Sequence, residues 1–175
     1  MHPDRFDVDA ARATARTLGE SASVVLVGPV VDLTREDYRA LQEDGVVILG
    51  PRPWDKIPAY LQHADVLLVP HVVNDFTESL DPIKLYEYRA VRRPVVATPV
   101  AGFRDGNDPL LTVVDADGFA TAVARALVPV AGVPRTGPTV HDPTMTEMPI
   151  PVWRDQAALM RAVIERIAPP ASTPR

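Results

Sequence analysis

Two charged residues, Lys84 and Glu87, stand three positions apart in the segment DPIKLYEYRA. On a helix, this spacing places both side chains on one face. Asp81 is a suitable N-cap and Pro82 a suitable first helical residue, so we expect a helix to begin there. The free amides of Ile83 and Lys84 would then lie at the positive end of the helix dipole, where anions bind.

The residue types in this segment suit a nucleotide. Lys84 adds a mobile positive charge beside the anion site, and Glu87 offers, one turn deeper, a carboxylate that two vicinal hydroxyls can share. Phosphate at the helix tip and ribose one turn away is therefore one consistent arrangement. A plain Lys–Glu ion pair on a solvated helix face, which stabilises a helix by about 0.2 to 0.5 kcal/mol, is the alternative that the spacing leaves open.

Composition narrows the classes of function. The 175-residue chain has a net charge of −5, so we expect no basic surface for nucleic acid. It has no cysteine, which suits a reducing cytoplasm, the location we expect. No apolar run approaches the roughly 18 residues of a membrane span. The 4 histidines lack metal-ligand spacing, so we expect no metal.

Apolar residues switch between helical spacing and short continuous runs, which is typical of helices alternating with buried parallel strands. The expected strands are residues 23–27, 46–49, 65–69, 94–97 and 110–114. The expected helices are residues 7–18, 34–42 with Thr34 as N-cap, 55–63, 82–91, 116–127 and 153–167. Because the strands are apolar on both faces, the predicted fold class is α/β, a doubly wound, Rossmann-like parallel sheet.

We expect a single domain over residues 1–168. Within it, residues 129–151 contain 6 prolines and are predicted to form an irregular strap, while residues 152–168 hold a closing helix. Residues 169–175 are predicted to be a disordered tail. Trp54 and Trp153 are expected to be packing anchors.

In a doubly wound sheet, ligands bind beyond the carboxyl ends of the strands, where the strand order reverses. Loops that begin at Gly28 and Gly50 follow two of the predicted strands, and a polar loop over residues 71–80 follows a third. Most connections in compact domains have about 4 to 6 residues. The length of this third loop therefore indicates binding.

The ordered segments RFD, VLVGP, LGPRPWDKIPAYLQHADVLLVP, DPIKLYEY and RRPVVATP resemble the C-terminal half of family 4 glycosyltransferases of the GT-B fold. The resemblance is closest to the branch of teichuronic acid and related polysaccharide transferases. WRDQAALM resembles the closing helix of that half, so the resemblance covers residues 5–167. It implies a retaining enzyme that transfers a sugar from a UDP- or GDP-linked donor to a glycan, lipid or small-molecule acceptor, with no cofactor besides the substrate.

The resemblance also assigns roles at the nucleotide site. Glu87 matches the glutamate that holds the ribose, Lys84 lies where the diphosphate is bound, and the loop from Gly50 to Arg52 flanks the base. Many members of the family carry a second glutamate near the donor sugar, and Ser79 takes that position here. Glu78 lies one residue before it. No catalytic residue is assigned. The residues expected at the site are Gly28, Gly50, Arg52, Ser79, Asp81, Ile83, Lys84 and Glu87.

The family enzyme needs an N-terminal half that binds the acceptor. We therefore expect this chain to act with an acceptor-binding domain on another chain, or as a homo-oligomer, and to be inactive alone. Membrane association is expected only through such a partner. Two alternatives remain, a non-catalytic nucleotide-binding or interaction module with this fold and an unrelated flavodoxin-like or receiver-like domain. Asp65 disfavours a receiver, because it begins its strand whereas a phosphoacceptor ends one.

The strand with which this half begins in the family has no counterpart before the first predicted helix. In the order 3-2-1-4-5-6 that strand is central. The strands at 23–27 and 65–69 would then flank a vacant position about 9 to 10 Å wide, twice the usual strand spacing. We expect either that a strand from another polypeptide fills this position or that the two flanking strands pair directly.

Overall fold

A computed structural model describes residues 1–2, 4–79, 83–106, 108–128 and 152–167. Contacts divide the chain into two compact units, Met1–Asp142 and Pro143–Arg175. The predicted strap at 129–151 and the predicted tail lie outside the described residues, as does Asp81. The single domain over residues 1–168 stays a prediction.

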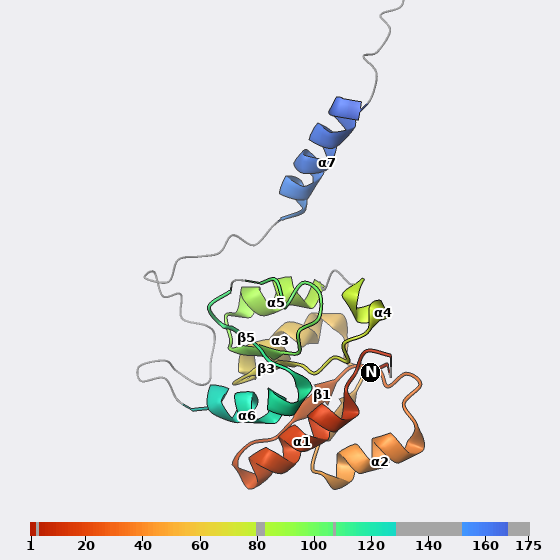
Figure 1. Cartoon of the computed structure of the whole chain (residues 1–175), viewed down its shortest axis with the longest axis vertical. Coiled ribbons are helices and arrows are strands. Elements are labelled where there is room, and N and C mark those ends of the chain that lie inside the picture. The colour runs from red at the N-terminus through yellow and green to blue at the C-terminus, as the bar shows by residue number, and fades with distance from the viewer. Residues whose placement is uncertain (3, 80–82, 107, 129–151, 168–175) are drawn as a thin grey trace, which may run out of the picture. The chain divides into compact units, whose positions relative to one another are not determined.

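The first unit alternates helices with short strands (Figure 1). Its strands are β1 (Val25–Val27), β2 (Val47–Gly50), β3 (Leu67–Val69), β4 (Val95–Ala97) and β5 (Leu111–Val113). Its helices are α1 (Val8–Leu18), α2 (Arg35–Glu43), α3 (Ile57–His63), α4 (Asp75–Glu78), α5 (Ile83–Val91) and α6 (Ala116–Ala126), with 3-10 turns η1 (Gly19–Ser21) and η2 (Trp54–Lys56). The predicted α/β alternation is confirmed.

Side-chain caps fix where the first two helices begin. The Asp7 carboxylate accepts a hydrogen bond from the Ala10 amide at 2.8 Å and so caps α1. The Thr34 hydroxyl accepts from the Asp37 amide at 3.0 Å and caps α2, as predicted. Each cap satisfies an amide that the first turn of a helix leaves unpaired.

The loop predicted after β3 contains a short helix, α4, so the prediction of an irregular segment over residues 71–80 was wrong at this point. The Asn74 side chain accepts from the Thr77 amide at 2.9 Å, and the Thr77 hydroxyl accepts from the Asn74 amide at 2.9 Å. This reciprocal capping box stabilises a single turn. A helix of one turn is too short to show an apolar period.

The strands form two parallel sheets, in the orders β1-β2 and β3-β4-β5. Val25 pairs with Val47 in the first sheet, and Leu67 pairs with Val95 in the second. The doubly wound α/β class is confirmed, but the sheet is in two pieces. β1 and β3 do not pair with each other, so the direct pairing offered as one expectation is not formed, and none of the described strands lies between them.

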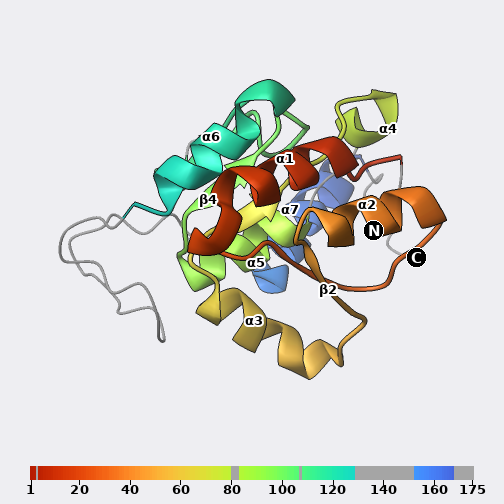
Figure 2. The ribbon, with the colours of Figure 1, turned by 90° about the horizontal axis from the view of Figure 1, so that it is seen from below.

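Helices cover the strands from two sides. Figures 1 and 2 show α1, α2 and α6 on one side and α3 and α5 on the other. The buried side chains on the first side, which include Leu41, Val96 and Phe119, form one apolar cluster that contacts both sheets. A second cluster around Phe103 lies between the β3-β4 pair and α5. The first cluster therefore holds the two sheets in one unit.

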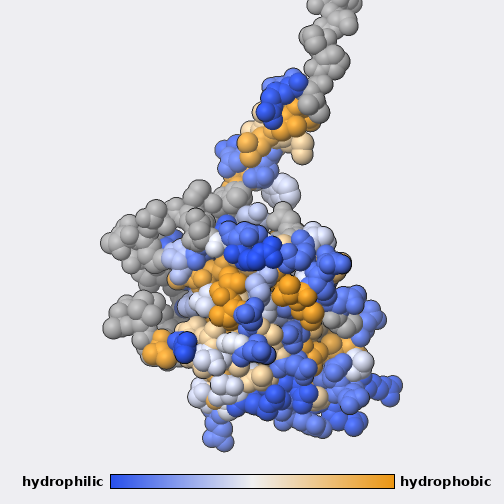
Figure 3. Space-filling model, viewed as in Figure 1, coloured by the Kyte–Doolittle hydropathy of each residue, from blue (hydrophilic) through white to orange (hydrophobic). Residues whose placement is uncertain are grey.

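The second unit contains α7 (Trp153–Ile167), whose predicted bounds are confirmed. Apolar side chains follow one another along this helix (Figure 3), and the exposed ones include Leu159, Met160 and Ile164. Trp54 is 84% exposed, so its prediction as a packing anchor is wrong, whereas the prediction for Trp153, in the second unit, stays untested. None of the described helices is long and apolar enough to cross a membrane.

Candidate functional site

The residues that follow β3 are fixed to the end of β4 by a buried threonine. The Thr98 hydroxyl accepts a hydrogen bond from the His71 amide at 3.1 Å and donates one to the His71 carbonyl at 2.6 Å. The Thr98 amide also donates to the Val69 carbonyl at 3.1 Å. Because Thr98 is only 1% exposed, this clamp holds the backbone of His71 at the carboxyl edge of the sheet.

The described residues of the segment 1–7, which are 1–2 and 4–7, lie at the carboxyl edge of both sheets. At one end the Val31 amide, after β1, donates to the Met1 carbonyl at 2.8 Å. At the other end the Asp7 amide donates to the Pro70 carbonyl at 2.8 Å, and the Val72 amide donates to the Arg5 carbonyl at 3.0 Å. Backbone pairing of this kind places Arg5 beside the residues that follow β3.

Arg5, His71 and Lys84 come together from three separate parts of the chain, and we call them the basic cluster. Burial lowers the pKa of His71 to about 4, with the positive charges of Lys84 and then Arg5 acting in the same direction. Loss of hydration, followed by the charge of Arg5, lowers the pKa of Lys84, and Glu87 acts in the opposite direction. The three side chains are therefore near enough to affect one another electrostatically.

Glu87 lies on α5 one turn after Lys84 and is half-buried. Besides opposing the lowered pKa of Lys84, its charge adds to burial in raising the pKa of Tyr88 to about 12. The Glu87 carboxylate is therefore near enough to Lys84 and Tyr88 to affect both electrostatically. The prediction that Lys84 and Glu87 share one helix is confirmed, and binding of a ligand by them stays a prediction.

Of the two glycines predicted at the site, Gly28 directly follows β1 and Gly50 is the last residue of β2. The Gly28 amide donates to the Gly50 carbonyl at 3.0 Å. Their φ angles of 135° and 69° are in the range that side chains disfavour, so a glycine is needed at each turn. The carboxyl ends of β1 and β2 are thereby joined at the edge of the first sheet.

The other predicted residues are less directly connected to the basic cluster. Arg52 is exposed and its Nε donates to the Tyr60 hydroxyl at 3.2 Å. The Ser79 hydroxyl donates to the Phe76 carbonyl at 2.7 Å, and Ile83 is 72% exposed. Asp81, the predicted cap of α5, lies outside the described residues.

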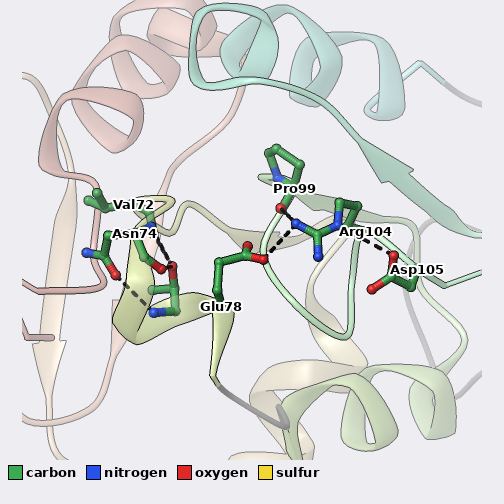
Figure 4. Close-up of polar contacts among 7 residues, drawn as sticks. Val72, Asn74, Glu78, Pro99, Arg104 and Asp105 are labelled. Atoms are coloured by element: carbon green, nitrogen blue, oxygen red, sulfur yellow. Dashed lines mark hydrogen bonds and ion pairs between the residues drawn. The ribbon is translucent and has the colours of Figure 1, made fainter.

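Glu78, one residue from the predicted position of an acidic group, already has a cationic partner. Its carboxylate faces the Arg104 guanidinium (Figure 4), with Oε2 at 2.8 Å from Nη1. Arg104 also lies 3.5 Å from the Asp105 carboxylate. This exposed ion pair joins the end of α4 to the loop after β4.

Two members of the basic cluster, Arg5 and His71, were not among the site residues predicted from the sequence. Nothing in their local spacing relates them to Lys84, because residues 5–7 reach β3 only through a non-local antiparallel bridge between Phe6 and His71. The one sequence signal was the position of His71 at the start of the polar loop. Within the described residues, no group of three or more acidic or histidine side chains is placed to hold a metal ion.

The arrangement offers positive charge, a neutral imidazole and a carboxylate at the carboxyl edge of a parallel sheet, where such folds bind ligands. Arginine has a planar fork of donors that suits phosphate oxygens, and a lysine adds a point charge. An anion among these three residues would relieve the repulsion between the charges of Arg5 and Lys84. The site is therefore suited to a ligand with a phosphate group and neighbouring hydroxyls.

Comparison with known proteins assigns the family. No curated protein matches the chain significantly. A family model described as "Glycosyl transferases group 1" matches residues 5–128, which include every strand, the basic cluster and Glu87. The match covers well over half of the 175 residues. The chain therefore belongs to the group 1 glycosyl transferases.

Proposed function

We propose that this chain is the donor-binding half of a retaining glycosyltransferase and that it binds a UDP- or GDP-linked sugar. The observation that carries the proposal is the convergence of Arg5, His71 and Lys84 at the carboxyl edge, with Glu87 one turn deeper on α5. In this proposal the diphosphate lies at the basic cluster and the ribose hydroxyls bond to Glu87. The base lies near Gly50 and Arg52.

The proposed chemical contribution of this half is electrostatic. When the bond between sugar and diphosphate breaks, negative charge develops on the leaving oxygen, and fixed positive groups stabilise that charge. Arg5 and Lys84 supply such groups, and His71, whose pKa of about 4 keeps it neutral at pH 7, can donate one hydrogen bond without repelling them. Front-face attack by the acceptor, with retention of configuration, then needs no carboxylate nucleophile in this half.

We propose that the acceptor and the groups that position it are held by an additional domain that acts together with this half. Correct positioning of two reactants supplies roughly 7 to 11 kcal/mol of a barrier. Assignment to family 4 and to the branch resembling teichuronic acid transferases is part of this proposal, supported by the segments from LGPRPWDK to RRPVVATP.

One observation favours a second candidate, a nucleotide-binding module without turnover. The position near the donor sugar carries Ser79, whose hydroxyl donates to the Phe76 carbonyl, and the neighbouring Glu78 is paired with Arg104. Among the described residues at that point, neither Ser79 nor Glu78 thus offers a free carboxylate to a sugar. Nucleotide binding would persist in such a module, and only reconstitution with an acceptor domain would separate it from the first candidate.

Calorimetric titration with UDP and GDP tests the binding proposal. Glu87→Ala should weaken binding by at least about 1.5 kcal/mol, or roughly tenfold, because the ribose hydroxyls lose a charged acceptor. Lys84→Ala should weaken it similarly. Matched controls are Lys56→Ala, which removes the other lysine, and Glu43→Ala, which removes an exposed glutamate at the end of α2. Unchanged affinity in both site variants, with measurable wild-type binding, would refute the proposal.

A further inference from the structure

The loop after β4 carries a cation, Arg104, that the proposed reaction has not yet used. Arg104 directly follows Phe103, which is fully buried, and its amide donates to the Val100 carbonyl at 2.9 Å. The backbone of Arg104 is thereby fixed against the core, while its side chain is 45% exposed. A charged side chain on a loop that a rigid scaffold holds in place is well suited to contact a ligand.

Arg104 lies against both segments that hold His71 in the basic cluster. Its Nη1 is 3.5 Å from the Pro99 carbonyl, and Pro99 follows Thr98, whose hydroxyl is bonded to the amide and the carbonyl of His71. The same Nη1 lies 2.8 Å from the carboxylate of Glu78, at the end of the segment that begins with His71 (Figure 4). Arg104 is therefore a cation at the same carboxyl edge as the basic cluster, although it is not a member of the cluster.

The order of the strands places Arg104 on the far side of the basic cluster from the base. In the proposed function the base lies near Gly50, at the end of β2, and the diphosphate lies at the cluster, beside the end of β3. β4 occupies one edge of β3, and the residues after β3 and after β1 are both bonded to the segment 1–7. The loop after β4 is thus on the side toward which the terminal phosphate, with its sugar, would point.

The charges of the cluster leave a need for one more cation during the reaction. A nucleotide sugar carries about two negative charges on its diphosphate, whereas a released nucleoside diphosphate carries about three, because a terminal phosphate has a second pKa near 6. Arg5 and Lys84 supply two positive charges. His71, whose pKa is about 4, adds none at pH 7, and Glu87 is negative. The cluster therefore has no positive charge left for the negative charge that develops on the leaving oxygen.

The present partner of Arg104 can be exchanged for a phosphate. Glu78 contacts the guanidinium through Nη1, and the Asp105 carboxylate lies 3.5 Å from Nε. Nη2 makes no hydrogen bond or ion pair with the described residues. Exposed ion pairs contribute little to stability because water screens both charges, whereas a terminal phosphate can accept from two N–H groups of an arginine at once. Such a phosphate can therefore displace Glu78.

We propose that Arg104 is a catalytic residue of this site and that Glu78 holds it in reserve until a donor is bound. This role rests on the proposed function, since it needs a diphosphate at the basic cluster. Arg104 leaves Glu78 and donates to the oxygens of the terminal phosphate. Because that phosphate gains negative charge as the reaction proceeds, Arg104 stabilises the leaving group more than it stabilises the bound donor.

The charge that Arg104 meets follows from the bonds that change. The bond between the sugar carbon and the diphosphate oxygen breaks, and its electron pair stays on that oxygen. The acceptor hydroxyl bonds to the sugar carbon and gives its proton to the departing oxygen. Until that proton arrives, the diphosphate carries one more negative charge than it did in the donor, and this is the charge that Arg104 stabilises.

The test varies the charge of the ligand and leaves out the sugar. Calorimetry at about pH 7.5 compares UDP, with about three negative charges, with UDP whose terminal phosphate is a methyl ester, which like a nucleotide sugar carries about two. Neither ligand contains a donor sugar, so the result does not depend on which sugar the enzyme transfers. GDP and its methyl ester serve in the same way if the base is guanine.

Arg104→Gln should weaken the binding of UDP about tenfold, the loss expected for one hydrogen bond between charged groups, and that of the methyl ester by less than about threefold. Glu78→Gln breaks the same ion pair but leaves the cation, so it should strengthen the binding of UDP. This variant separates loss of the pair from loss of the charge. Arg39→Gln, at an exposed position of α2, is the matched control and should change neither affinity.

An equal change for both ligands in Arg104→Gln, or no change for either, would overturn the proposal. Weaker binding of UDP in Glu78→Gln would overturn it too, because the two residues would then act as a unit and Glu78 would hold nothing in reserve. If neither UDP nor GDP binds the wild-type chain, the proposed function fails and the role of Arg104 fails with it. If UDP binds equally to the wild type and to Arg104→Gln, only the role of Arg104 is refuted.

Discussion

The titration of His71 gives the sharpest test of the basic cluster, because it needs no ligand. The perturbation is Arg5→Gln, which removes one positive charge and keeps a side chain of similar length. Since Arg5 lowers the pKa of His71, the variant should titrate at higher pH than the wild type. Lys84→Met should act in the same direction, and more strongly.

The size of each change is bounded by the structure. The pKa of His71 falls from 6.5 to about 4, and burial is the largest cause, Lys84 the second and Arg5 the third. The smallest of three contributions is at most a third, so Arg5→Gln should raise the pKa by no more than about 0.8, which is about 1.1 kcal/mol. Lys84→Met should raise it by no more than about 1.2. With both charges removed, burial alone should keep the pKa below about 5.7.

The difference between the pKa of His71 in the unfolded and in the folded chain determines how the unfolding free energy changes with pH. The unfolded chain takes up a proton on His71 near pH 6.5, whereas the folded chain does so near pH 4. The unfolding free energy should therefore fall as the pH drops from about 6.5 to about 4 and be unaffected by this group above that range. For a half-buried ring, partly screened by water, the loss is of order 2 kcal/mol.

Nuclear magnetic resonance of the imidazole protons across pH 3 to 8 measures these values. Arg52→Gln is the matched control, because Arg52 is exposed and is not among the causes that act on His71. Added inorganic diphosphate should raise the pKa of His71, since a nearby negative charge favours the imidazolium. A wild-type value near 6.5, or an Arg5→Gln value equal to that of the wild type, would show that the cluster does not exist.

The remaining predictions concern the loop after β3 and the reaction. Thr77→Val should lower the unfolding free energy by about 1 to 3 kcal/mol, because the buried hydroxyl that accepts from the Asn74 amide and donates to the Val72 carbonyl at 2.8 Å is lost. Chemical denaturation measures this change in the unfolding free energy. The control is Thr112→Val, at the exposed position of β5. Equal losses of unfolding free energy in both variants would contradict the role of the capping box. The purified chain should transfer no sugar to any acceptor and should release sugar from the donor only slowly. An assay with a radiolabelled donor measures both reactions. Sugar transfer by a preparation free of contaminating enzyme would contradict the need for a partner.

The sequence predicted the elements well where their signals are local. The cap at Thr34 and the bounds of α7 follow from residue types within one or two turns, and both are confirmed. The strands are shorter than predicted, as β1 begins at Val25 and not at residue 23, because an apolar run does not show where pairing begins. α4 was missed, since one turn held by Asn74 and Thr77 has no period to detect.

Only part of the candidate site could be predicted from local signals in the sequence. Lys84 and Glu87 share a helix face, and their relation is visible from spacing alone. Arg5 and His71 join them through hydrogen bonds between residues 5–7 and 70–72, which are more than 60 positions apart in the chain. Only the path of the backbone places these residues together, and no local pattern encodes that path.

The interruption in the sheet and the basic cluster share one structural element, residues 1–7. This segment bonds to the residues after β1 and after β3, and it carries Arg5 into the cluster. Anything that fixes the separation of the two carboxyl ends therefore also fixes the position of Arg5 relative to His71 and Lys84. If ordering this segment strengthens nucleotide binding by some factor, nucleotide must favour the ordered segment by that same factor, because coupling between two sites is reciprocal.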